Sequence, residues 1–62
     1  MKVSLSLGEI IVKERKHRGI TQEELARAVG VSTSAVSKWE CGNTYPDITL
    51  LSPIARFLGI TV

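Results

Sequence analysis

The chain has 62 residues, of which 44% are hydrophobic and 23% are charged, and its formal net charge is +2 at neutral pH. This composition excludes a disordered or low-complexity chain, and the length allows one small domain over residues 1–62. A domain of this size buries only about 60% of the surface of its unfolded chain. Such a core cannot also enclose a water-free cavity, so we expect a binding module and not an enzyme.

The sequence carries no signature of a membrane, secreted or metal-binding protein. No apolar run approaches the roughly 18 residues of a membrane span, and the N-terminal segment is too polar for a signal peptide. One cysteine, Cys41, and one histidine, His17, cannot assemble an internal disulfide or a structural zinc site. We therefore expect a cytoplasmic protein that needs no metal or cofactor and does not contact a membrane.

Positive charge is concentrated in the first half of the chain. Residues 1–31 carry six cationic side chains against four glutamates, a balance of +2, whereas residues 32–62 carry two of each sign. The basic cluster from Lys13 to Arg18 has two interpretations. It is either the solvated C-terminal end of a helix, where cations are favoured by the helix dipole, or a nucleic-acid contact.

A capping box marks the start of the first predicted helix. Ser6 is followed three residues later by Glu9, and this pair satisfies backbone N–H groups at a helix N-terminus. Apolar residues then recur at helical spacing until Gly19, which supplies the left-handed conformation that often ends a helix. The sequence thus predicts a helix that begins at Leu7 and stops at Gly19.

The same device predicts a second and a third helix. Thr21 with Glu24 forms another capping box, and Gly30 ends the second helix after about two turns. Ser32 follows closely and is a favourable N-cap, so a third helix is expected over residues 33–41.

Two further short helices are expected in the C-terminal third. After a loop, Asp47 caps a helical turn over residues 48–51. Pro53 would cost about 3 kcal/mol inside a helix but is favoured at the first helical position, which predicts a break at Ser52 and a last helix over residues 53–58. With no strand pattern in the sequence, the expected fold is all-α, a compact bundle of about five short helices.

The connection between the second and third predicted helices carries the main functional signal. Residues 30–32 leave room only for a steep crossing, which suits a helix-turn-helix over about residues 21–41. Val36 and Trp39 recur at the inward spacing and are expected in the core. Glycine-stopped helix pairs also occur in helical hairpins that do not bind DNA, so this spacing alone leaves both interpretations open.

The combination of five segments is more specific than any one of them. These segments are residues 19–26 (GITQEELA), 30–32 (GVS), 36–42 (VSKWECG), 46–48 (PDI) and 54–59 (IARFLG). Together they resemble the Cro/repressor-type helix-turn-helix family, also called the XRE family, over about residues 7–62. The resemblance implies a lambda-repressor-like DNA-binding domain of a bacterial or phage transcriptional regulator. It further implies repression and binding as a homodimer to a palindromic operator in double-stranded DNA. We expect this homodimer to be weak, because a chain of this length offers only a small interface.

The resemblance also assigns roles to single residues. The third helix would lie in the major groove, where its outward side chains reach base edges. The base-reading positions are Thr33, Ser34, Ser37 and Lys38. The phosphate-contacting positions are Gln22, Ser32, Asn43 and Thr44. A plain solvated helix face is the alternative interpretation of the serines, and Thr21 is expected only to cap its helix.

Two further positions match the family pattern and one departs from it. Arg15 and Glu40 stand where members often have an ion pair between the first helix and the end of the third, although Arg15 could instead contact a phosphate. Glu14 stands where members usually have an apolar residue, so it is expected at the edge of the core. The chain ends at Val62, where members generally continue into a further helix.

A second function class uses the C-terminal segment. Four apolar residues crowd the end of the chain: Phe57, Leu58, Ile60 and Val62. Exposed apolar surface marks interaction sites, so this segment is expected to form the homodimer interface. Alternatively, the main role of the chain is protein–protein interaction through this segment, as in an antitoxin-like or assembly module.

Overall fold

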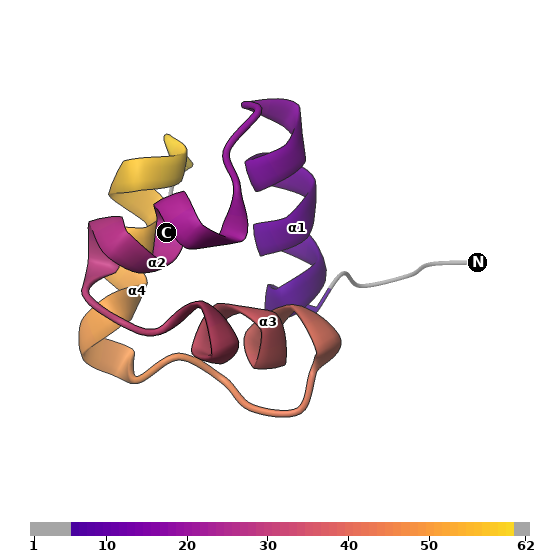
Figure 1. The fold of residues 1–62 in the computed structure, drawn as a ribbon, viewed down its shortest axis with the longest axis vertical. Coiled ribbons are helices and arrows are strands. Elements are labelled where there is room, and N and C mark those ends of the chain that lie inside the picture. Colours follow the sequence, from indigo (N-terminus) through magenta and orange to yellow (C-terminus); the bar gives the residue numbers. More distant parts are fainter. Residues whose placement is uncertain (1–5, 61–62) are drawn as a thin grey trace.

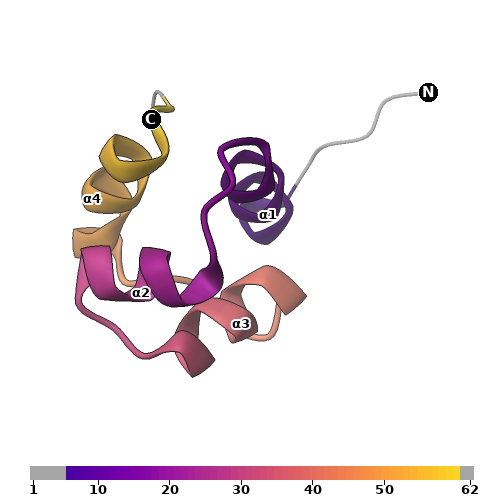
Figure 2. The same ribbon diagram turned by 45° about the horizontal axis from the view of Figure 1, so that its top comes forward.

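The computed structural model describes residues 6–60, which form four helices: α1 (Leu7–His17), α2 (Gln22–Val29), α3 (Thr33–Cys41) and α4 (Ile48–Leu58). This range contains no strand, which confirms the all-α prediction. α1 and α4 stand on opposite sides of the molecule and α3 crosses beneath them (Figure 1). Figure 2 shows the chain turning from the end of α2 into α3, with the two helices packed as neighbours. None of these helices is long and apolar enough to cross a membrane.

The helix starts follow the predicted caps. Ser6 and Thr21 each complete a capping box with the glutamate three residues on. The Ser32 hydroxyl accepts a hydrogen bond from the backbone N–H of Ala35 at 3.1 Å, and an Asp47 carboxylate oxygen accepts one from Thr49 N–H at 2.9 Å. Because each cap satisfies backbone groups within a few residues of itself, the starts of all four helices are set locally.

The prediction of about five helices is wrong because α4 continues through Pro53. We expected a break at Ser52, but residues 48–58 form one helix with the proline inside it. A proline in this place costs about 3 kcal/mol. Continuing the helix buries Ile54 and Leu58, each worth about 1.5–3 kcal/mol. Tertiary packing therefore outweighs the local cost of the proline.

The core is built from all four helices. Its buried members are Ile11, Leu25, Ala26, Val36, Trp39, Ile54 and Leu58. Trp39 is thus a core residue, as expected. The prediction that Leu58 contributes to an exposed C-terminal surface is wrong, because this side chain is fully buried. Phe57 is 41% exposed, Ile60 packs partly buried against the core, and Val62 lies outside the described residues.

The turn between α2 and α3 has the expected glycine geometry. Gly30 adopts the left-handed conformation, with φ 80° and ψ 33°. Its N–H and that of Val31 both donate to the carbonyl oxygen of Ala26 at 2.9 Å. Val31 packs partly buried against the core. The turn thus satisfies the carbonyl group of Ala26 in the last turn of α2 and directs the chain into α3.

A second glycine sets how closely α1 approaches α3. Gly8 is buried in the first turn of α1. A Cβ built on it would overlap the carbonyl oxygen of Trp39 and lie 3.3 Å from the Cα of Glu40. The neighbouring atoms are backbone, which cannot rotate away. Only glycine therefore fits this crossing.

Gly8→Ala tests this close approach. Alanine is favoured over glycine inside a helix by up to about 1 kcal/mol, but an added methyl group in a filled space costs about 1–3 kcal/mol. We expect Gly8→Ala to lower the free energy of unfolding by about 1–2 kcal/mol, measured by urea denaturation followed by circular dichroism. The matched control is Lys13→Ala on the exposed face of the same helix. A Gly8→Ala protein as stable as the wild type would contradict the packing.

Candidate nucleic-acid interface

α3 presents the predicted base-reading residues on its outward face. Val36 and Trp39 point into the core, and helical spacing turns the opposite face of α3 toward solvent. Thr33, Ser34 and Lys38 are exposed on that face, and Ser37 is half-buried. The outward face of α3, defined by these four residues, combines three short hydroxyl side chains with one long cation.

The loop after α3 continues this surface. Asn43 and Thr44 are exposed, and their backbone N–H groups donate to the carbonyl oxygen of Lys38 at 3.0 and 3.4 Å. These bonds hold the loop against the end of the helix. Pro46 is buried and anchors the other end of the loop. Asn43 and Thr44, the two residues predicted to contact phosphate here, therefore lie in a loop that backbone hydrogen bonds hold next to α3.

Beyond that loop, Asp47 starts α4. Hydrogen bonds from the backbone N–H and then from the hydroxyl of Thr49 lower the pKa of the Asp47 carboxyl below its ordinary value. The carboxylate therefore acts as the N-cap of α4.

Two apolar side chains near Asp47 are exposed, which was not predicted from the sequence: Tyr45 is 69% exposed and Ile48 is 80% exposed.

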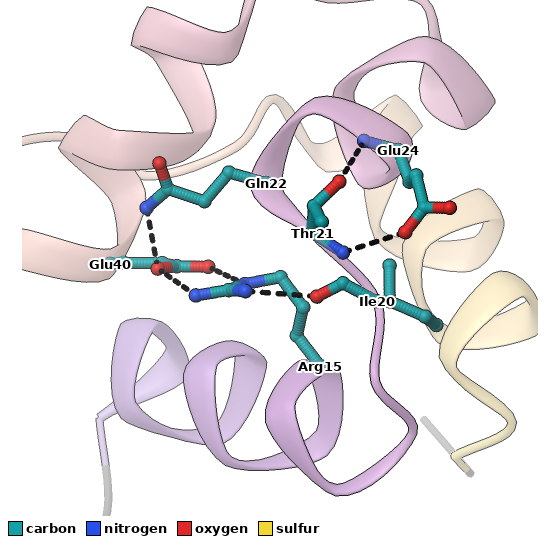
Figure 3. A network of polar contacts seen from close by, with 6 residues as sticks. All are labelled: Arg15, Ile20, Thr21, Gln22, Glu24 and Glu40. Carbon is teal, nitrogen blue, oxygen red and sulfur yellow. Dashed lines mark hydrogen bonds and ion pairs between the residues drawn. The ribbon is translucent and has the colours of Figure 1, made fainter.

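An ion pair lies behind the candidate surface and joins α1 to α3 (Figure 3). Arg15 Nε donates to Glu40 Oε2 at 2.7 Å and Arg15 Nη2 donates to Glu40 Oε1 at 3.1 Å. Arg15 Nη1 also donates to the carbonyl oxygen of Ile20 at 2.9 Å, which ties in the chain just before α2. The two side chains are only 12% and 7% exposed. The expected ion pair is therefore present, and Arg15 is engaged in it.

Gln22 joins the same network from α2. Its Nε2 donates to Glu40 Oε1 at 2.8 Å, and the side chain is half-buried. Three helices thus meet at one carboxylate. No local sequence pattern indicates this contact, because the two residues are 18 positions apart. Ser32, the remaining predicted phosphate contact, is exposed and uses its oxygen as the α3 cap.

The network also sets the protonation of Glu40. Burial removes water from the carboxylate and raises its pKa. Hydrogen bonds from Arg15 and Gln22, together with the positive charges of Arg15 and Lys16, act in the opposite direction. Their combined effect is larger, so the pKa of Glu40 lies below its ordinary value. Glu40 is therefore ionised at neutral pH.

The C-terminal end of α1 lies away from this surface. α1 begins beside α3 and runs away from it, so residues 16–18 at its C-terminal end are far from the outward face of α3 (Figure 1). This placement favours the interpretation of residues 16–18 as a solvated helix end, whereas Arg15 of the same cluster is held in the ion pair. Glu14 is partly exposed, with its Oε1 4.0 Å from Arg18 Nε, and so lies at the edge of the core as expected.

The lowered pKa of Glu40 predicts a pH-dependent contribution to stability. A carboxyl whose pKa is lower in the folded than in the unfolded chain stabilises the fold above the unfolded value, near 4.5, and loses that contribution as the pH falls through the folded value. We expect the wild type to be more stable than Glu40→Gln at pH 7. The difference should shrink steadily below about pH 4.5, as measured by thermal denaturation at a series of pH values. A difference that does not depend on pH would contradict this account.

Comparison with known proteins agrees with this geometry. A family described as helix-turn-helix matches residues 11–62. The chain is 36% identical over 58 residues to the HTH-type transcriptional activator BcrR of Enterococcus faecalis. It is 39% identical over 59 residues to the putative multi-protein-binding factor 1 of Yarrowia lipolytica. The two alignments cover 94% and 95% of this chain but only 28% and 39% of those relatives.

Solved structures show the same fold. The P22 c2 repressor in complex with a synthetic operator superposes with a TM-score of 0.87 at 34% identity, over 94% of this chain and 88% of that one. The solution structure of the DNA-binding domain of the P22 c2 repressor gives a TM-score of 0.89 at 33% identity, over 97% and 79% of the two chains. Together with the match over residues 11–62, these likenesses establish that the chain belongs to the helix-turn-helix family of the Cro/repressor (XRE) type.

Proposed function

We propose that this chain binds double-stranded DNA with sequence preference, as the DNA-binding part of a transcriptional regulator. The observation that carries the proposal is the outward face of α3, which the core and the Arg15–Glu40 ion pair hold in one orientation. The likeness to a repressor whose structure contains its synthetic operator supports the same conclusion. In this proposal α3 lies in the major groove, as recognition helices of this fold class do.

The chemistry of the outward face suggests modest base selectivity. Lys38 is long enough to donate to guanine O6 and N7, whereas Thr33, Ser34 and Ser37 carry short hydroxyls that accept or donate with any base. No Arg or Gln on this face offers a two-pronged contact to a base. Part of the selectivity would then come from the shape of the DNA.

Four neutral residues would fix the register on the sugar-phosphate backbone. Backbone contacts orient a protein on the duplex without reading sequence. Gln22 lies at the N-terminus of α2, where free N–H groups favour a phosphate. The other three flank the two ends of α3, and the full set is Gln22, Ser32, Asn43 and Thr44.

The proposed biological outcome is repression by occupancy of an operator, with a weak homodimer on a palindromic site. Among the described residues of the predicted dimer surface, Phe57 is the exposed one. It lines a shallow hollow between α2 and α4 with Ala28, Pro53 and Arg56. The surface available for pairing is therefore smaller than expected, which is consistent with a dimer completed on DNA.

Protein interaction is the second candidate function. The name of the Yarrowia relative, a putative multi-protein-binding factor, and the hollow beside Phe57 favour it. Selection of bound fragments from random duplex DNA separates the two functions. Recovery of a palindrome supports operator binding by a dimer. Recovery of no common sequence, together with binding to a protein partner that does not weaken with salt, would favour the interaction module.

Lys38→Ala tests base reading by the outward face of α3. Loss of one specific base contact should weaken binding to the selected site by about 1–3 kcal/mol and relax the preference at one base pair. The matched control is Lys16→Ala, which removes the same charge from the far end of α1 and should leave base preference unchanged. The measurement is fluorescence anisotropy on a panel of duplexes with single base changes. Equal weakening of binding to every duplex would instead indicate that Lys38 contacts the sugar-phosphate backbone of the DNA.

A further inference from the structure

The Gln22 amide is held in one orientation by Glu40. A glutamine side chain ends in a donor group and an acceptor group of nearly the same shape, so an isolated amide can face a neighbour either way. An ionised carboxylate only accepts hydrogen bonds. Because Glu40 is ionised and nearly buried, the NH2 end of Gln22 must face it, as Figure 3 shows. The reverse orientation would place two oxygen atoms against each other.

This orientation leaves one donor on Gln22 uncommitted. The Nε2 group carries two N–H bonds, and the bond to Glu40 Oε1 at 2.8 Å uses one of them. The second N–H remains at the half-buried N-terminal end of α2, beside α3. A phosphate oxygen accepts hydrogen bonds and cannot donate one, so this N–H is the only part of the amide that a DNA backbone can use.

The charge of Glu40 would itself repel a phosphate, but Arg15 offsets it. The guanidinium group holds both carboxylate oxygens, at 2.7 and 3.1 Å, so the pair is neutral as a whole. The carboxylate can then orient Gln22 without adding a net negative charge next to the DNA.

We propose that Glu40 is a positioning residue for DNA backbone contact, which fixes the Gln22 amide so that its second N–H binds a phosphate. This inference rests on the proposed DNA-binding function. It assigns Glu40 a role beyond holding α3, and it explains why a neutral glutamine at this place makes a directional contact.

The first test uses the wild-type protein and a mixed-sequence duplex of about 20 base pairs at low salt, because a backbone contact does not depend on sequence. Nuclear magnetic resonance resolves the two Nε2 protons of Gln22. On addition of the duplex, we expect the outer proton to shift and the proton bound to Glu40 to stay. Equal shifts of both protons, or none while the α3 signals move, would overturn the proposal. A protein that shows no shifts at all would instead contradict the proposed function.

The second test is a double-mutant cycle on the same duplex. Gln22→Ala removes about one net hydrogen bond and should weaken wild-type binding about fivefold. In Glu40→Gln, residue 40 can both donate and accept, so the Gln22 amide is free to turn. There we expect Gln22→Ala to weaken binding about twofold or less. The cycle cancels the direct effect of the lost charge and any shift of α3, because both are present with and without Gln22. The same fold loss in both backgrounds would overturn the proposal, and if Glu40→Gln does not fold, the first test still decides.

Discussion

The ion pair between Arg15 and Glu40 is the constraint on which the rest of the structure depends. It connects α1 to the end of α3 and, through Ile20 and Gln22, to the start of α2. In a chain of 62 residues the apolar core is small, and apolar contacts do not specify direction. A nearly buried, two-pronged Arg–Glu pair does specify it. We infer that the core provides most of the stability, while this pair sets the orientation of α3.

The parts of the fold that depend on neighbours in sequence were predictable. Ser6, Thr21, Ser32 and Asp47 cap the helices that they were expected to cap, because a cap acts on N–H groups two or three residues away. The predictions were wrong where contacts between residues far apart in the sequence determine the structure. Pro53 breaks a helix by local rules, yet the burial of Leu58 and Ile54 keeps α4 continuous. The same burial removed Leu58 from the predicted dimer surface.

The candidate site divides in the same way. Helical periodicity and the resemblance placed Thr33, Ser34 and Lys38 on one exposed face, and the structure agrees with that placement. Whether these side chains read bases remains a proposal. The Gln22–Glu40 contact was not predictable, because no local pattern relates two side chains 18 residues apart that meet only once three helices have packed. The sequence was therefore sufficient to predict the exposed residues of α3, but not the hydrogen bond between Gln22 and Glu40 that lies behind them.

In the proposed function, this protein contacts DNA through the outward face of α3. The most direct measurement maps backbone amide shifts of the wild-type chain on titration with its selected duplex. The account predicts that the largest shifts fall on residues 32–38 and 43–44, with small changes at the hollow beside Phe57. Shifts confined to Ala28, Arg56 and Phe57, with α3 unchanged, would contradict it.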